Sequence, residues 1–219
     1  DVYLFGELPD GSLYLVMEYL EGRTLAQALF EDGHFALARG LRIAHATAMG
    51  VGAAHRQGIV HRDVKPENIM LVKRDGDPDF VKVLDFGIAR LLWDEQSHIT
   101  QSGVIFGTAR YISPEGASGE ATDARSDVYS LAVLTYQLLS GSLPFDDPSP
   151  VALLMKHLRQ KPPPLESRPG GAHVPLAIAE VVMRGLNKHP DARHDNAAAF
   201  ARALESAAAT SGVAITPEM

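Results

Sequence analysis

The sequence predicts an α+β fold that is mainly helical and carries a small β-sheet near its N-terminal end. Residues 2–6 and 13–18 are apolar, strand-like runs joined by the turn Pro9-Asp10-Gly11-Ser12, which predicts a β-hairpin. Residues 37–57 carry apolar side chains at helical spacing. A segment ending at Ser140 is apolar nearly all round, as expected of a buried helix. With 219 residues, the chain is long enough to bury a sizeable core.

The remaining elements follow from local signals. A two-stranded hairpin is marginal in water, so we expect residues 2–18 to need further sheet. Residues 85–115 show no period and are predicted to form one long loop. Asp123 is expected to cap the buried helix, with Gly141 as its stop, and the chain is expected to fray from Thr210. Further helices are predicted at 24–31, 150–158, 175–186 and 196–208, and strands at 69–72 and 81–84 around a polar loop, 73–79.

Composition excludes several classes of protein. The net charge is −7 and no basic stripe appears, which argues against nucleic-acid binding. No cysteine is present, so disulfides and thiolate metal sites are impossible, a composition that fits a reducing cytoplasm. No leader follows Asp1, and no apolar run approaches the roughly 18 residues of a membrane span. We therefore expect no membrane segment in this chain.

Two neighbouring motifs carry the chemistry: His61-Arg62-Asp63-Val64-Lys65-Pro66-Glu67-Asn68, and Asp85-Phe86-Gly87. Phosphoryl transfer needs positioned groups and charge neutralisation more than covalent chemistry. Asp63 offers a carboxylate that can orient a substrate hydroxyl, and Lys65 a charge for the transferring phosphate. Asn68 and Asp85 offer oxygen ligands of the kind that Mg²⁺ prefers.

These motifs, in this order and at this spacing, resemble the catalytic core of protein kinases in the serine/threonine form, of the bacterial eukaryotic type. The resemblance runs from the first residue to about Leu204. It implies a protein-kinase-like fold: the end of the N-lobe with the hinge at 1–20, a mainly helical C-lobe at 21–208, and a tail at 209–219. It also implies ATP and Mg²⁺ as cofactors and proteins as substrates.

The segment Val16-Met17-Glu18-Tyr19-Leu20-Glu21-Gly22 resembles the hinge between the two kinase lobes. On that analogy the backbones of Glu18 and Leu20 would hydrogen-bond adenine. Met17 would be the gatekeeper and Met70 the floor of the pocket. Taken alone, the two methionines are equally well explained as ordinary core filling.

Residues 107–115 resemble the end of a kinase activation segment. The resemblance implies that Thr108 contacts Asp63 and Lys65 and that Glu115 pairs with Arg193. Asp127 matches the family aspartate that braces the His61-Arg62-Asp63 backbone. The alternative is that Asp127 is a first-turn charge favoured by the helix dipole.

Arg62, directly before Asp63, is typical of kinases that are switched on by activation-loop phosphorylation. A phosphate on Thr100 or Ser102 would pair with Arg62 and order the loop. We expect Thr100 to be the main site, with a dimer as the arrangement for autophosphorylation; the alternative is that both residues are simply polar loop residues. The histidines His45, His55 and His61 are interpreted as structural rather than as metal ligands.

No glycine-rich loop and no strand lysine precede the catalytic motifs, and Lys73 and Lys82 follow them in the wrong order for that role. We therefore expect weak or absent ATP binding by this chain in isolation. An active serine/threonine kinase, present here as a partial catalytic domain, is the favoured interpretation. A pseudokinase or protein-interaction module is the second, and a small-molecule phosphotransferase the third. The expected location is cytoplasmic, with any membrane anchor of the parent protein in segments outside this sequence.

Overall fold

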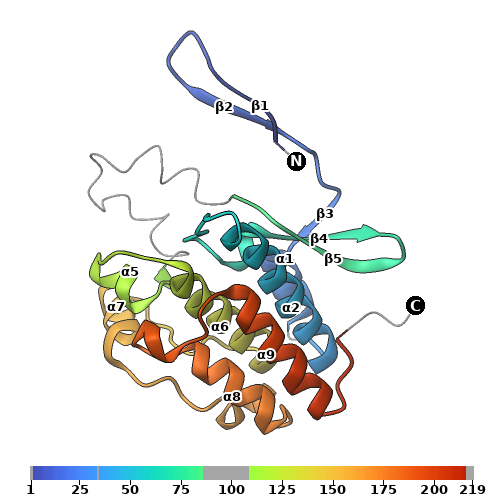
Figure 1. Ribbon diagram of the computed structural model, residues 1–219, viewed down its shortest axis with the longest axis vertical. Coiled ribbons are helices and arrows are strands. Elements are labelled where there is room, and N and C mark those ends of the chain that lie inside the picture. Colours follow the sequence, from blue (N-terminus) through green and yellow to red (C-terminus); the bar gives the residue numbers. More distant parts are fainter. Residues whose placement is uncertain (1, 34, 86–108, 216–219) are drawn as a thin grey trace.

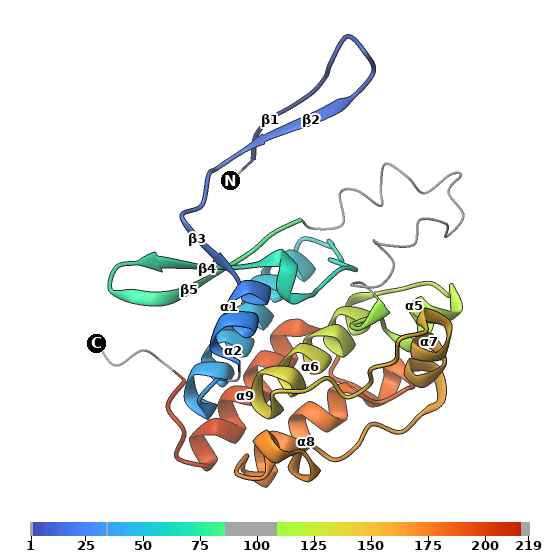
Figure 2. The same ribbon diagram turned by 180° about the vertical axis from the view of Figure 1, so that it is seen from behind.

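The computed structural model describes residues 2–33, 35–85 and 109–215. It has the predicted α+β composition: a helical body with two small antiparallel sheets (Figure 1). Strands β1 (Val2–Glu7) and β2 (Leu13–Met17) form the predicted hairpin, with Phe5 opposite Leu15. This hairpin projects away from the body in Figures 1 and 2.

The second sheet has the strand order β3-β4-β5 and is built from β3 (Gly22–Thr24), β4 (Ile69–Arg74) and β5 (Asp77–Val83). The prediction of a polar loop at 73–79 is wrong in extent, because the two strands continue outward to a tight turn at Asp75-Gly76. Both turn residues have positive φ, 51° and 86°. The hairpin end lies largely in solvent, so strand pairing there did not need an apolar sequence. Strand β3 is too short to carry a pattern and was not predicted.

Helices α1 (Leu25–Asp32) and α2 (Leu37–His55) follow β3 in the chain and lead into the helical body. Thr24 begins α1 through a capping box, in which its side chain accepts from the Gln27 N–H and the Gln27 side chain accepts from the Thr24 N–H. Both helices lie within two residues of their predicted bounds. The turn that follows α2 delivers the chain to the catalytic motif.

Helix α6 (Ala124–Ser140) is the centre of the body. Fourteen of its 17 residues are buried, which confirms the prediction of a buried helix. Asp123 caps it by accepting from the Arg125 N–H, and Gly141 ends it in the left-handed region at φ 72°. The other helices of the body are α5 (Pro114–Ser118), α7 (Pro150–Arg159), α8 (Leu176–Gly185) and α9 (Ala197–Thr210).

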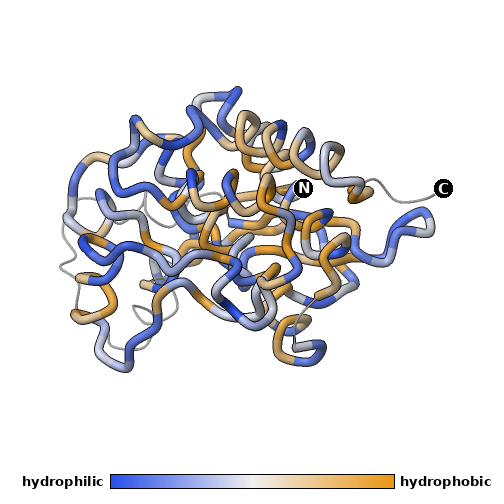
Figure 3. The backbone as a smooth tube through the Cα atoms, turned by 90° about the horizontal axis from the view of Figure 1, so that it is seen from below, coloured by the Kyte–Doolittle hydropathy of each residue, from blue (hydrophilic) through white to orange (hydrophobic). Residues whose placement is uncertain are grey.

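Helices α2, α8 and α9 pack around α6 and enclose one main hydrophobic core (Figures 1 and 2). Seen from below, the hydrophobic stretches gather inside the body and the hydrophilic ones on its outer turns (Figure 3). α2 and α9 approach closely at Gly52, where an added Cβ would lie 2.9 Å from the Ala198 nitrogen. The expectation that the chain frays from Thr210 is wrong for residues 211–215, because Val213 and Ile215 pack against the core. In the part of the chain that the structure describes, no helix is both long enough and apolar enough to cross a bilayer.

Candidate active site

The first motif forms a compact loop between α2 and β4. The Lys65 Nζ lies 2.8 Å from the Asp63 Oδ2. The Asn68 Nδ2 donates to the Asp63 carbonyl oxygen at 2.8 Å and to its Oδ2 at 3.0 Å. A short 3₁₀ helix, Pro66–Asn68, turns Asn68 back toward Asp63. Residues that lie two and five positions after Asp63 are thus brought to one carboxylate, which is one-third exposed.

This loop is held from below by Asp127, in the first turn of α6. Its two carboxylate oxygens accept from the backbone N–H groups of His61 and Arg62, both at 2.7 Å. Asp127 is fully buried. Arg62 has a φ of 65°, an uncommon conformation for a side-chain-bearing residue. The carboxylate therefore stabilises a strained backbone directly before Asp63, which favours the bracing role over that of a simple helix-dipole charge.

His55, which the sequence indicated only as a structural residue, makes contacts with two other helices. Its Nε2 lies 2.8 Å from the Asp127 Oδ2, and its Nδ1 lies 3.3 Å from the Ala197 nitrogen. His55 thus links the end of α2, the start of α6 and the start of α9. No local signal in the sequence could have shown this, because its partners lie 72 and 142 residues away.

The second motif is attached to the first by backbone and histidine hydrogen bonds. The Leu84 N–H donates to the Asn68 carbonyl at 2.8 Å, and the His61 Nε2 lies 2.9 Å from the Leu84 carbonyl. Asp85 follows with a φ of 52° and is exposed. Sixteen residues separate Asn68 from Asp85 in the chain. Because Leu84 is bonded to Asn68 and Asp85 follows Leu84, these contacts place Asp85 beside Asn68.

Asn68 and Asp85 fit a magnesium site by their donor chemistry. The Asn68 amide nitrogen donates to Asp63, which leaves its amide oxygen as the group for a cation. Asp85 offers an exposed carboxylate. Mg²⁺ is usually held by one or two such oxygens together with water and substrate phosphates. No cluster of three or more His, Asp or Glu side chains suited to a metal ion occurs in the described ranges.

The predicted hinge residues lie between the two sheets. Met17 ends β2 and is 44% exposed, and Glu18 to Leu20 form an irregular connection to β3. The Glu18 carboxylate accepts from the Lys82 Nζ on β5 at 2.7 Å, and this bond lowers the pKa of Glu18. Met70, on β4, lies opposite Thr24 of β3 and is half-buried. The Lys82 contact was not foreseen.

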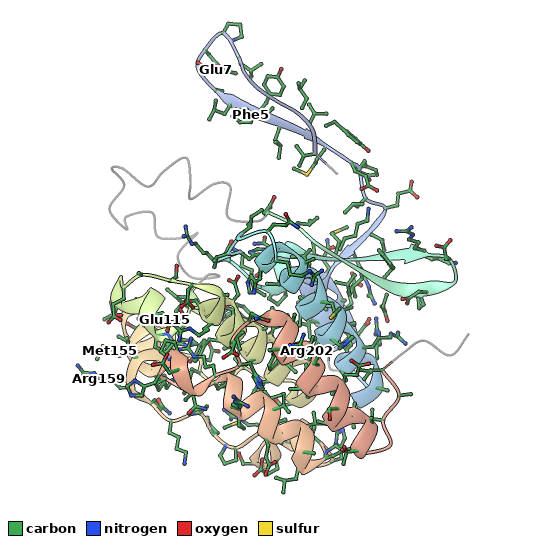
Figure 4. All side chains as sticks on the ribbon, viewed as in Figure 1. Phe5, Glu7, Glu115, Met155, Arg159 and Arg202 are labelled. Atoms are coloured by element: carbon green, nitrogen blue, oxygen red, sulfur yellow. The ribbon has the colours of Figure 1, made fainter. Side chains whose placement is uncertain are left out.

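Glu115 and Arg193 form a buried ion pair at the start of α5. The Arg193 Nη1 and Nη2 lie 2.7 and 2.8 Å from the two Glu115 oxygens. Burial alone would raise the pKa of Glu115, but hydrogen bonds from Arg193 and from the Ser126 hydroxyl outweigh it and lower the pKa. Arg193, 1% exposed, also donates to three backbone carbonyls, those of Asn187, Lys188 and Arg125. The pair thus ties α5 to the loop before α9, and Glu115 is labelled in Figure 4.

Thr100, Ser102 and Thr108 lie outside the described residues, as do Phe86 and Gly87 of the second motif. Tyr111, three residues after Thr108, is buried, and its hydroxyl donates to the Gln137 Oε1 at 2.6 Å. The described site therefore comprises the catalytic loop, Asp85 and the Asp127 brace.

The chain is similar to known protein kinases over most of its length. The family model of the protein kinase domain matches residues 3–202. The serine/threonine-protein kinase PknB of Mycolicibacterium smegmatis is 45% identical over 193 residues, which are 88% of this chain and 30% of that protein. The serine/threonine-protein kinase pkn3 of Myxococcus xanthus is 41% identical over 204 residues, 92% of this chain and 37% of that protein. The chain thus spans about a third of the length of these relatives.

Proposed function

The chain belongs to the protein kinase family, and on that premise we propose that the protein containing it transfers the γ-phosphate of ATP to serine and threonine hydroxyls of proteins. The observation that carries the proposal is the convergence of Lys65 and Asn68 on the Asp63 carboxylate. Sequence spacing alone does not create that geometry. It needs the turn at 66–68 and the brace from Asp127.

In this proposal Asp63 accepts the hydrogen bond of the substrate hydroxyl, orients its oxygen for in-line attack and takes its proton. Asn68 holds the Asp63 carboxylate in place through its amide N–H. Lys65 lies within reach of the same carboxylate and supplies positive charge beside the transferring group. Thr108, by the family resemblance, supports Asp63 and Lys65 from the activation segment.

Asn68 and Asp85 would hold Mg²⁺, which when bound neutralises the charge of the ATP phosphates. The backbones of Glu18 and Leu20 would hold adenine, with Met17 and Met70 as the apolar walls of that pocket. The Lys82–Glu18 ion pair supports this assignment, because it ties the hinge to β5, the strand that leads into Asp85. Asp127 and the Glu115–Arg193 pair act by positioning the loop and α5.

We further propose that the activity is regulated by phosphorylation of Thr100 or Ser102. Arg62 is exposed, and its side chain is separate from the backbone N–H that Asp127 holds. A phosphate would pair with its guanidinium through charge-assisted hydrogen bonds. Phosphopeptide mass spectrometry of active protein tests this assignment, which fails if neither residue is modified.

The test of function is Asp63→Asn in the full-length gene product. The amide cannot accept the hydroxyl proton, so phosphate transfer from ATP to a protein substrate should fall by about 10²- to 10⁴-fold. Asp75→Asn is the matched control, since Asp75 is 89% exposed in the β4–β5 turn and asparagine tolerates its positive φ. A wild-type protein that folds but transfers no phosphate would instead favour an interaction module.

A further inference from the structure

A polar cavity lies beside Gln137, the residue whose side chain accepts from the Tyr111 hydroxyl. It has a volume of about 550 Å³ and is open to solvent. Its walls come from Arg110, the last turn of α6 with the loop after it, α7, and the connector that ends at Arg168. Its lining residues include none of those assigned to ATP, to magnesium or to the Asp127 brace.

Three cationic side chains line this cavity: Arg110, Lys156 and Arg168. The Arg168 Nε donates to the Tyr136 hydroxyl at 2.9 Å, and its Nη2 makes only long contacts of 3.3 and 3.4 Å with backbone carbonyls. Within the described ranges, no carboxylate forms an ion pair with Arg168. A guanidinium without a carboxylate partner, on the wall of a cavity, is a ready donor for an anion.

Arg110 is also incompletely satisfied. Among the described residues, its one ion pair is loose, with 3.5 Å between its Nη2 and the Asp146 Oδ1. Its Nε is buried and has no hydrogen-bond partner in the described chain. Buried donors are normally paired, so this nitrogen marks a place where an acceptor is missing. Asp146 is itself 63% exposed and so is only weakly bound to Arg110.

The balance of charge around the cavity is positive. Lys156 is held by Asp147 at 3.0 Å, and Asp146 stands beside Arg110, which leaves one cation in excess. Gln137 adds a neutral donor, because its Oε1 already accepts from Tyr111 and its amide nitrogen remains. Donors from four segments therefore line one space, and Asp146 is the carboxylate among its lining residues.

Tyr111 connects this cavity to the catalytic loop. A smaller cavity on its other side is lined by Arg62, Asp63 and Tyr111 itself, while the Tyr111 hydroxyl bonds Gln137 on the wall of the polar cavity. An extended peptide advances by about 3.3 Å per residue. A substrate whose hydroxyl lies at Asp63 would therefore have to extend past Tyr111 and Gln137 to present a side chain to this cavity.

We propose that this cavity, lined by Arg110, Lys156 and Arg168, binds an anionic side chain of the protein substrate and so directs the enzyme toward acidic or phosphorylated sequences. That the bound side chain belongs to a substrate rests on the proposed kinase function, but the binding itself does not require phosphate transfer. Glutamate, aspartate and phosphoserine share the required chemistry, since each presents planar or tetrahedral oxygens that arginine donors bind.

The test is a peptide titration of the chain by NMR, without nucleotide. The probes are hexaglutamate, a hexapeptide carrying one phosphoserine among alanine and glycine, and hexaglutamine. We expect the first or the second to shift the Arg110 and Arg168 side-chain signals, and hexaglutamine not to do so. The tighter of the two anionic probes identifies the source of the anion. Equal shifts with hexaglutamine, or none with either anion, would overturn the proposal.

Arg110→Gln should weaken binding of the anionic probe about tenfold, and Lys156→Gln should have a similar or smaller effect. Arg159→Gln is the matched control: it removes the same charge from α7, yet Arg159 is exposed, points outward in Figure 4 and does not line the cavity. An equal loss of affinity for the anionic probe in Arg159→Gln would mean that only the overall positive charge matters, and it would overturn the proposal of a specific site. Thermal unfolding of each variant shows whether it is folded. Retained peptide binding in a full-length protein that transfers no phosphate would contradict the kinase function and leave the anion site standing.

Discussion

The helical body contains charged side chains that are almost completely buried, whereas the N-terminal hairpin leaves large apolar side chains in solvent. In the body, Asp127 and Arg193 are 0% and 1% exposed. In the hairpin, Leu4 and Phe5 are 53% and 54% exposed, and both faces of the two strands carry such residues. Each region thus inverts the usual distribution, and the two inversions have different physical causes.

In the body, each of these buried charges has its hydrogen bonds. Asp127 accepts from two backbone N–H groups and from His55, and Arg193 bonds one carboxylate and three carbonyls. Desolvation is costly, but it is offset when every donor and acceptor is paired. In the hairpin, the exposed apolar groups gain nothing from burial, and a two-stranded hairpin is marginal alone. The comparison therefore teaches that the body contains the partners of its own buried charges. In the described part of the chain, the apolar side chains of the hairpin have no such partners.

The largest expected effect comes from breaking the buried pair in the body. Arg193→Ala leaves the Glu115 carboxylate buried without its cation, which should cost about 3–5 kcal/mol of unfolding free energy. For a chain of this size that corresponds to a fall in Tm of roughly 6–20 °C, measured by differential scanning calorimetry. The control is Arg202→Ala, since Arg202 is exposed on α9. Equal Tm values for the two variants would mean that the ion pair does not stabilise the body.

A smaller effect concerns a buried histidine. His157 on α7 is 0% exposed, with its Nδ1 3.0 Å from the Tyr129 hydroxyl. Burial, helped by the nearby charge of Lys188, lowers the pKa of His157 to about 3. Because the folded pKa lies below the unfolded value of about 6.5, the unfolded chain binds a proton more readily. Stability is therefore retained above pH 6.5 and lost as the pH falls toward 3.

Between pH 6 and pH 4, the wild-type unfolding free energy should fall more steeply than that of His157→Gln, by about 1.4 kcal/mol per pH unit. Glutamine has no titrating group, so the variant lacks this contribution. Urea unfolding across this range gives the slope. His45 and His194, whose pKa values burial also lowers, titrate in both proteins, so they cancel in the difference. Replacing the exposed His173 with Gln should leave the wild-type slope unchanged. Parallel slopes for wild type and His157→Gln would show that the buried ring is not neutral in the way described.

The same contrast explains what the sequence could predict. The positions of α2 and α6 were predicted correctly because the spacing of apolar residues along the local sequence indicates a buried helix. The extension of β4 and β5 was missed because residues 73–78 are mostly exposed, and polarity does not separate strand from loop there. The catalytic loop was predicted because its groups lie within five residues of Asp63.

The parts of the site that escaped prediction depend on distant partners. His55 contacts Asp127 across 72 residues, and Lys82 contacts Glu18 across 64. Neither contact leaves a mark in the local sequence. The anion cavity is similar, since Arg110, Lys156 and Arg168 come together only when α7 and the connector after it pack beside the last turn of α6. The family resemblance named the Glu115–Arg193 pair, but its three backbone carbonyl partners required the structure.

The smallest expected effect lies in the hairpin and tests the comparison from its other side. Phe5→Ser removes a ring that is 54% exposed, on an element that projects from the body. Its effect on the unfolding free energy of the body should stay within about 0.5 kcal/mol. Phe200→Ser, in which a ring 0% exposed in the core is removed, should cost at least the 3–5 kcal/mol typical of Phe→Ala. Urea unfolding monitored by far-UV circular dichroism compares the two.

The folded protein should nevertheless show a larger change in the binding of a dye such as ANS, which binds exposed apolar surface, with Phe5→Ser than with Phe200→Ser. That signal should fall, because the ring contributes to an apolar surface that remains accessible. If Phe5→Ser instead lowers stability as much as Phe200→Ser does, the hairpin packs against the body in solution. The two regions would then share one core, and the contrast between them would disappear.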